Sequence, residues 1–218
     1  PSQYVPVVLR ELQIDDGAQA HAREDQQRRI VFYGSSITHC RHAAGPSETW
    51  PALVARRAGL HLTCLGYGGQ CHLDPMVGRM IRDLPADLIG LKLGINMMSG
   101  SYNDRTFRAA AIGLIQTIRD GHADTPIAVV SPLYNAPREQ TPNPVGMTLE
   151  LMRQRLREAC DLLQEQGDAN LHYIDGLELI GPGDEHLYVD GTHPSAEGYR
   201  FLAKAYSSKV MPKLGVST

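Results

Sequence analysis

The 218-residue sequence predicts an α/β fold, a three-layer αβα sandwich in which helices cover both faces of a parallel five-stranded sheet. Five short apolar runs have the character of strands that are buried on both faces. Segments with apolar residues at helical spacing separate these runs, and such an alternation is typical of parallel sheets. Small and polar residues follow several runs, at the edge where these sheets hold their functional sites.

The strands are expected where leucine, isoleucine and valine are concentrated. In chain order they span residues 30–33, 62–65, 88–93, 127–130 and 171–174. Each is a short run of the kind that is covered on both faces of a sheet.

The helices are expected between the strands. Residues 48–57 have Pro51 in the first turn and Gly59 just past the end, and Asp74 is an N-cap residue followed by proline at the first helical position. Apolar residues recur at helical spacing in three later segments, residues 107–118, 149–163 and 199–206.

The first 27 residues do not follow this alternation. Val5, Val7 and Leu9 alternate with their neighbours as in an edge strand, and a polar stretch follows them. We therefore divide the chain into an N-terminal strand or linker extension over residues 1–27 and one α/β domain over residues 28–218. The proline-rich residues 135–146 are expected to form a surface loop near the mouth of the site.

Composition limits the partners of the protein. A formal net charge of −3 provides no basic field for nucleic acid or an anionic membrane, which leaves a small-molecule substrate. No apolar run approaches the roughly 20 residues that span a bilayer. The four cysteines are too few for a disulfide scaffold, so we expect reduced thiols and a cytoplasmic protein. The chain begins with Pro1, which leaves a removed leader open, and the oligomeric state is not assigned.

A hydroxyl and an acid-base pair stand at opposite ends of the chain. Gly34-Ser35-Ser36 follows the first strand, where a serine on a tight turn can act as a nucleophile. Asp190 and His193 lie three residues apart after the last strand, and the proline that follows His193 keeps its imidazole on the loop. Together they supply the parts of a hydrolytic triad.

Two further segments can donate hydrogen bonds to a developing negative charge. Residues 66–70 are glycine-rich and follow the second strand, and Asn96 follows the third. A dinucleotide-binding fingerprint fits residues 66–70 poorly, because the next helix begins only at Asp74 and the acid at the expected distance, Asp87, precedes its strand.

At these residues the chain resembles the SGNH (GDSL-type) hydrolase superfamily, whose four blocks occur here in order. They read Gly34-Ser35-Ser36-Ile37, Gly66-Tyr67-Gly68-Gly69, Gly94-Ile95-Asn96 and Asp190-Gly191-Thr192-His193. The resemblance implies a flavodoxin-like sheet, Ser36 as nucleophile, His193 as base and then acid, and Asp190 as its partner. It also implies an oxyanion hole made of the Ser36 and Gly69 amides and the Asn96 side chain, with no metal or organic cofactor.

The blocks depart from the family pattern at three positions. Ser35 stands where the family commonly has aspartate, Met97 stands where the third block commonly continues with aspartate, and Cys64 stands where the second commonly opens with asparagine. None of these departures removes a catalytic group, but they make the substrate pocket harder to infer.

The predicted function is that of a serine esterase acting on a short-chain acyl ester, such as acetyl on a carbohydrate or natural product. An acyltransferase that passes the same acyl group to an alcohol is one alternative, and a non-catalytic small-molecule-binding domain is another. Tyr67, Met97, Met98 and Tyr134 adjoin the strand ends and are the candidate substrate-binding residues of a partly apolar pocket.

Rival assignments stay open for several polar residues. Ser35 is a rival nucleophile, and His186 with Asp184 repeats an acid-base arrangement. Zinc is an alternative for His39, Cys40, His42, Cys71 and His72, but their spacings match no closed structural site, so no metal is expected. A disulfide between Cys40 and Cys71 is the alternative for an exported protein.

Overall fold

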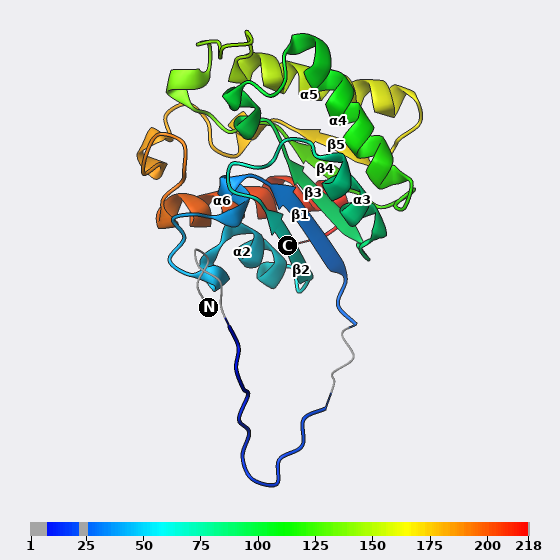
Figure 1. Ribbon diagram of the computed structural model, residues 1–218, viewed down its shortest axis with the longest axis vertical. Coiled ribbons are helices and arrows are strands. Elements are labelled where there is room, and N and C mark those ends of the chain that lie inside the picture. The colour runs from blue at the N-terminus through cyan, green and yellow to red at the C-terminus, as the bar shows by residue number, and fades with distance from the viewer. Residues whose placement is uncertain (1–7, 22–25, 218) are drawn as a thin grey trace.

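The computed structural model describes residues 8–21 and 26–217 and contains one five-stranded parallel sheet (Figure 1). The strand order is β2-β1-β3-β4-β5, and every neighbouring pair runs in parallel. The strands predicted from the apolar runs are confirmed to within one residue at each end. They are β1 (Arg29–Gly34), β2 (His61–Gly66), β3 (Leu88–Lys92), β4 (Ile127–Val130) and β5 (Leu171–Ile174).

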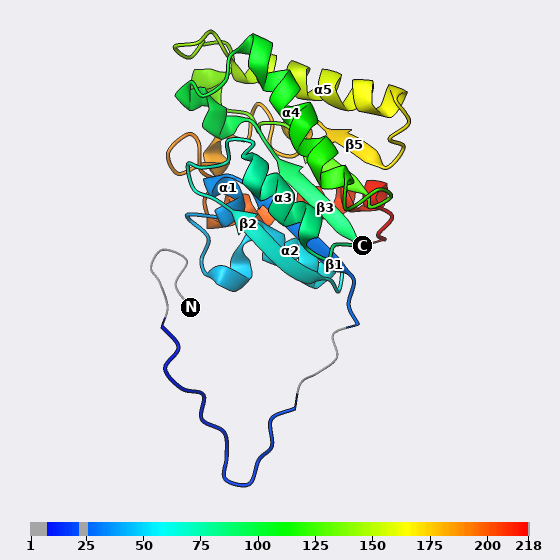
Figure 2. The same cartoon turned by 45° about the vertical axis from the view of Figure 1, so that its right-hand side comes forward.

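Helices cover both faces of this sheet (Figure 2), which confirms the three-layer sandwich. On one face α2 (Trp50–Arg57) packs against α6 (Ala196–Lys209). On the other face α4 (Asp104–Arg119) packs between α3 (Pro75–Asp83) and α5 (Leu149–Glu165). The short helix α1 (Ser36–His39) follows β1, and 3₁₀ helices span Pro46–Glu48, Ile95–Ser99, Ala136–Arg138, Gly176–Glu178, Glu185–Leu187 and Met211–Leu214.

Side-chain caps fix where the helices begin. The N-cap residues of all six α-helices accept a hydrogen bond from a backbone amide of the first turn, which satisfies a donor that the helix leaves unpaired. The helix expected from residue 48 begins instead at Trp50, because Thr49 is the cap and Glu48 belongs to the preceding 3₁₀ helix.

Two parts of the chain differ from the sequence-based expectation. β2 is an edge strand and is partly exposed along its length rather than covered on both faces. Of the residues expected in an edge strand, Val5 and Val7 lie outside the described residues, and Leu9 belongs to residues 8–21, which form no strand. Val8 and Leu9 are each 80% exposed in this segment, which runs away from the sheet (Figure 1).

An aromatic cluster joins β1 to the helices of one face. The ring centroids of Phe32, Trp50 and Tyr206 lie 4.8–5.4 Å apart, and all three side chains are buried. The Trp50 indole nitrogen also donates a 2.9 Å hydrogen bond to the carbonyl of Ile37, so the core holds α1 directly. Within the described residues, no helix combines the length and apolar character needed to cross a membrane.

The strand order creates the crevice that the site occupies. The chain goes from β1 to β2 on one side and then crosses back to β3, β4 and β5 on the other. Parallel sheets bind ligands outside the carboxyl ends of the strands at such a reversal. The segments that follow β1, β2 and β3 therefore converge at one edge.

Replacing Gly90 by alanine tests the packing of the aromatic cluster. A Cβ at this position would lie 2.5 Å from the Phe32 ring and 2.8 Å from the Tyr206 hydroxyl. Because the core must shift to accept it, we expect Gly90→Ala to lower the free energy of unfolding by about 1–3 kcal/mol in urea denaturation. Gly113→Ala in α4 is the matched control, with no atom within 4 Å of its Cβ and no expected loss. Equal stability of Gly90→Ala and wild type would contradict the packing.

Candidate active site

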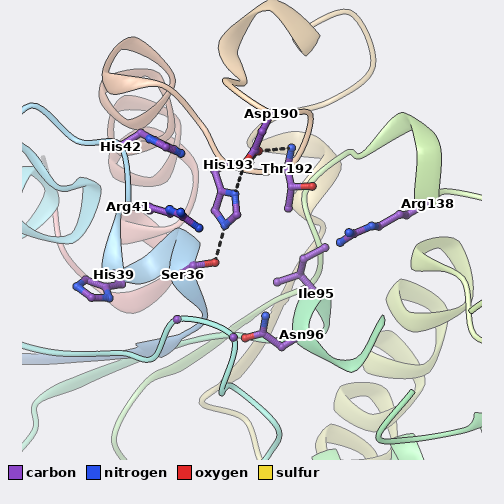
Figure 3. Close-up of a pocket in the computed structure, with 12 residues that line it drawn as sticks. Ser36, His39, Arg41, His42, Ile95, Asn96, Arg138, Asp190, Thr192 and His193 are labelled. Atoms are coloured by element: carbon purple, nitrogen blue, oxygen red, sulfur yellow. Dashed lines mark hydrogen bonds and ion pairs between the residues drawn. The ribbon is translucent and has the colours of Figure 1, made fainter. Parts of the chain in front are cut away.

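Ser36 is the first residue of α1, directly after β1. Ser35 is the N-cap of this helix, and its buried hydroxyl accepts a 3.2 Å hydrogen bond from the Ile37 amide. The Ser36 side chain is half-buried and lines a cavity of about 830 Å³ (Figure 3). Of the two neighbouring hydroxyls, that of Ser36 therefore faces the cavity, while that of Ser35 caps the helix.

The turn that carries Ser36 needs a glycine on the neighbouring strand. Gly34 and Gly66 are register partners at the ends of β1 and β2, and α1 packs directly over β2. A Cβ on Gly66 would lie 2.4 Å from the backbone nitrogen of His39. Only glycine allows this close approach, so Gly66 fixes how near α1 lies to the sheet.

A chain of hydrogen bonds links Asp190, His193 and Ser36 across the cavity wall (Figure 3). Ser36 Oγ lies 2.8 Å from His193 Nε2, and His193 Nδ1 lies 2.7 Å from Asp190 Oδ2. The second carboxylate oxygen, Oδ1, accepts from the backbone amides of Thr192 and His193. With Nδ1–H donating to the carboxylate, Nε2 is the imidazole atom that can accept the serine proton.

The environment keeps Asp190 ionised. Burial opposes the charge, but the backbone amide of His193, its imidazole and the amide of Thr192 outweigh that effect and lower the pKa of Asp190 to about 2. The carboxylate therefore remains a hydrogen-bond acceptor for His193 throughout the neutral and mildly acidic range.

The three residues expected to form an oxyanion hole, Ser36, Gly69 and Asn96, line the same cavity. The backbone amides of Ser36 and Gly69 donate to no other described residue. Asn96 accepts a 3.0 Å hydrogen bond from the Cys71 amide through Oδ1, which leaves its Nδ2 for the cavity it lines. Gly69 has φ +72°, a left-handed conformation that favours glycine.

His72 holds the glycine loop in place. Its Nε2 lies 3.0 Å from the Gly69 carbonyl and its Nδ1 lies 2.9 Å from the Ser101 hydroxyl. A carbonyl only accepts, so Nε2 carries the proton and Nδ1 accepts from Ser101. His72 therefore links the glycine loop to the segment that carries Ser101.

Asn135 ties the loop after β4 to the loop of Asp190 and His193. Its buried side chain donates to the Gly191 carbonyl at 2.8 Å and to the Thr192 hydroxyl at 2.9 Å. The backbone amide of Asn135 donates to the carboxylate of Glu139, and this carboxylate forms an ion pair with Arg153. The sequence-based reasoning missed Asn135, because neither its spacing nor its type distinguishes it from an ordinary turn residue.

The cavity contains two arginines that lie outside the motifs, Arg41 from the segment after α1 and Arg138 from the proline-rich loop. Ile95 and Thr192, which belong to motif blocks but were given no role, also line it, as does His42. The position of that loop near the mouth of the site was expected, and it is Arg138 that reaches the cavity (Figure 3).

The four residues predicted to bind substrate do not line this cavity. Met97 is wholly buried in the core. Tyr67 is partly buried and packs against the core, with its ring centroid 6.2 Å from that of Tyr33. Tyr134 lines a separate hollow, and Met98 lines one that adjoins the cavity beyond Asn96. Adjacency to a strand end in sequence did not decide which way these side chains point.

The rival residues lie elsewhere. His186 is exposed outside the cavity, and the Asp184 carboxylate accepts from the Gly181 amide. Cys40 and Cys71 are buried free thiols.

The residues considered for zinc do not gather into one site in the described structure. The group of possible ligands found within residues 8–21 and 26–217 is His42, Asp190 and His193, whose ligand atoms lie within 4.8 Å of one another. A cation held there would compete with the hydrogen bonds of His193.

Comparison with known proteins finds one matching family. The profile of the GDSL-like lipase/acylhydrolase family matches residues 27–211. No curated protein sequence matches the chain significantly.

Solved structures resemble the chain over most of its length. The salicylyl-acyltransferase SsfX3 from a tetracycline biosynthetic pathway has 37% identity and a TM-score of 0.83, over 91% of this chain and 58% of that protein. A GDSL-like protein from Bacteroides ovatus has 26% identity and a TM-score of 0.74, over 88% and 55% respectively. The lipase/acylhydrolase from Enterococcus faecalis, with 22% identity and a TM-score of 0.64 over 87% and 97%, shares the fold. The chain thus spans less than two thirds of the first two proteins.

The low pKa of Asp190 predicts a pH-dependent contribution to stability. A carboxylate whose pKa is lower in the folded than in the unfolded chain stabilises the fold above about pH 4, and this contribution is lost as the pH falls toward 2. We expect Asp190→Asn to lower the melting temperature at pH 7, and the difference from wild type to shrink at pH 3. Thermal melts of both proteins at the two pH values measure it. A difference that is the same at pH 7 and pH 3 would contradict the assignment.

Proposed function

Because the chain belongs to the GDSL-like lipase/acylhydrolase family, we propose that it is a serine esterase that hydrolyses a short-chain acyl ester through an acyl-enzyme on Ser36. The observation that carries this proposal is the hydrogen-bond chain from Asp190 through His193 to Ser36 at the wall of an open cavity. A triad and an oxyanion hole are typical of the family.

In the acylation step, Ser36 Oγ attacks the carbonyl carbon of the ester and its proton passes to His193 Nε2. The imidazolium then gives this proton to the alcohol oxygen as the bond between that oxygen and the acyl carbon breaks. Asp190 holds the ring in the required tautomer and stabilises its charge, a role that its pKa of about 2 supports. The alcohol leaves, and the acyl group stays on Ser36.

The negative charge that develops on the carbonyl oxygen needs donors already in position. The amides of Ser36 and Gly69 and the Nδ2 group of Asn96 fill this role in the proposal, since the Cys71 amide fixes which end of the Asn96 side chain faces the cavity. Such donors are worth roughly 3 kcal/mol each in acyl-transfer enzymes.

Water completes the cycle. It gives a proton to His193 and attacks the acyl carbon, and His193 returns the proton to Ser36 Oγ as the carboxylic acid leaves. The cavity that Ser36 and His193 line gives water access to this carbon. No step draws on a metal or an organic cofactor.

Substitution of the two neighbouring serines tests the proposal. We expect Ser36→Ala to lower kcat for 4-nitrophenyl acetate by about 10⁴-fold or more, because nothing replaces the attacking oxygen. Ser35→Ala is the matched control and retains much of the activity, since it loses a helix cap worth about 1 kcal/mol rather than the nucleophile. Mass spectrometry after treatment with a fluorophosphonate should find the label on Ser36. The reverse ranking, or label on Ser35, would overturn the assignment, and absence of both turnover and label would favour a binding domain.

An acyltransferase is the second candidate function. The observation that favours it is the 37% identity to a salicylyl-acyltransferase, although the chain spans only 58% of that protein. In this reaction an alcohol rather than water takes the acyl group from Ser36, and His193 removes the proton of that alcohol.

The partition of the acyl group separates the two functions. If the protein is an esterase, adding glycerol or a phenol at 50 mM should leave carboxylic acid as the main product, because water is present at about 55 M and no acceptor is bound. Chromatography of the products measures the ratio. A transfer product in excess of the acid at this concentration would require a bound acceptor and would establish the acyltransferase instead.

A further inference from the structure

The cavity contains two guanidinium groups that the proposed reaction does not use. Arg41 follows α1, and Arg138 ends the 3₁₀ helix over Ala136–Arg138; both line the cavity that contains Ser36. The side chain of neither forms an ion pair or a hydrogen bond with a described residue. By contrast, Arg119 and Arg155 are paired with carboxylates on the helical side of the molecule.

The two guanidinium groups lie on opposite sides of the catalytic pair. In Figure 3, Arg41 lies on the α1 side of His193, and Arg138 points in from the opposite wall beyond Ile95. An ester bound with its carbonyl at Ser36 therefore has one arginine near each of its halves.

The positive charges of Arg41 and Arg138 exceed the negative charge that the lining residues of the cavity supply. The one carboxylate among its lining residues is Asp190, and both of its oxygens already accept hydrogen bonds from Thr192 and His193. The chain as a whole has a net charge of −3, so this positive surface is a local property of the site. Planar guanidinium groups bind carboxylates and phosphates through two parallel hydrogen bonds.

Both arginines are attached to the segments that carry the chemistry. Cys40 adopts a left-handed conformation with φ +64°, which reverses the chain after α1, and the Arg41 amide then donates to the Ser36 carbonyl. The Cys40 side chain is buried in the core, and its thiol donates a 3.3 Å hydrogen bond to the Ile37 carbonyl. Non-glycine residues in this conformation are uncommon and concentrate at functional sites.

The segment that carries Arg138 is fixed from the other side. The Arg138 amide donates to the carbonyl of Asn135, and the Asn135 side chain donates to Gly191 and Thr192. The backbone of each arginine is thus held relative to Ser36 or to His193, while its guanidinium group has no hydrogen-bond or ion-pair partner among residues 8–21 and 26–217.

Arg138 also lies where two hollows meet. A second hollow of about 430 Å³ shares Gly69, Ile95, Asn96 and Arg138 with the cavity and continues toward the proline-rich loop. Its other lining residues are the apolar Met98, Pro137, Pro142 and Pro144 and the polar Ser99, Thr141 and Asn143. This hollow has room for the larger half of an ester, with Arg138 beside it.

We propose that the substrate is an anionic ester, whose carboxylate or phosphate group is bound by Arg41 or by Arg138, according to which half of the ester carries it. The proposal rests on the proposed esterase function, since it assigns a substrate class to the same site. It adds that the acyl or alcohol half next to one of these arginines carries the negative charge.

Matched esters that differ in charge test this substrate class. The acyl pair is mono-4-nitrophenyl succinate and 4-nitrophenyl butyrate. The alcohol pair is 4-acetoxybenzoate and its methyl ester, and 4-acetoxyphenyl phosphate replaces the carboxylate by a phosphate. We expect kcat/KM to be at least about tenfold higher for the anionic member of one pair, and this ratio to fall as salt is added.

Variants assign the effect to the two arginines. Arg41→Gln or Arg138→Gln should reduce the ratio of anionic to neutral kcat/KM by about 10- to 100-fold, mainly through KM, because a charge-assisted hydrogen bond is lost. Arg105→Gln is the matched control, since Arg105 is exposed on α4 outside the cavity, and it should leave the ratio as in wild type. Equal kcat/KM within every pair, or a ratio that neither substitution changes, would overturn the proposal.

A binding experiment separates this proposal from the proposed function. Titration calorimetry with phenyl phosphate, benzoate and the neutral benzamide requires no turnover. Anion binding that weakens about tenfold in Arg138→Gln or Arg41→Gln supports the proposal even if no ester is hydrolysed, in which case the esterase function alone fails. Hydrolysis of 4-nitrophenyl butyrate without any preference for anions in either assay overturns the substrate class and leaves the esterase function standing.

Discussion

The hydrogen bond between Ser36 and His193 is the interaction on which the arrangement of the site depends. It joins side chains 157 positions apart in the sequence at a distance of 2.8 Å. Such a bond forms only because β1 lies inside the sheet between β2 and β3, where the strand order reverses, and because the last loop returns over the same edge before α6. The Trp50 indole, which belongs to the aromatic cluster, donates to the carbonyl of Ile37 directly after Ser36, so the hydrophobic core sets the position of the nucleophile.

Backbone hydrogen bonds decide the direction in which the polar groups of the site point. Asp190 accepts two amides through one oxygen and the imidazole through the other. The Cys71 amide donates a hydrogen bond to Oδ1 of Asn96, and the His72 ring donates one to the Gly69 carbonyl. Each of these contacts occupies the group that the proposed chemistry does not need and leaves the complementary donor or acceptor facing the cavity. The site is therefore ordered before any ligand enters, as electrostatic stabilisation of a transition state requires.

Strain is concentrated in the same region. Cys40 and Leu73 are the non-glycine residues with positive φ in the described part of the chain, and they follow the Ser36 segment and the Gly69 segment. Conformations of this kind cost of order 1–3 kcal/mol each and persist where the surrounding structure enforces them. Burial of both side chains provides that enforcement. The turn at Cys40 brings Arg41 and His42 to the wall of the cavity. The turn at Leu73 is followed directly by Asp74, the N-cap of α3.

The sequence by itself determined the strands, the helix order and the four segments that meet at the site, because burial on both faces and short turns leave strong local patterns. It could also rank Ser36 above Ser35, through the resemblance of whole motifs. Tertiary structure alone decided which side chains face the cavity. Met97 follows a motif block and Tyr67 lies within one, yet Met97 is buried in the core and Tyr67 packs against that core, whereas Arg138 and Asn135 come from a loop with no motif. The orientation of a loop side chain depends on contacts with segments far away in the sequence, and no local pattern records them.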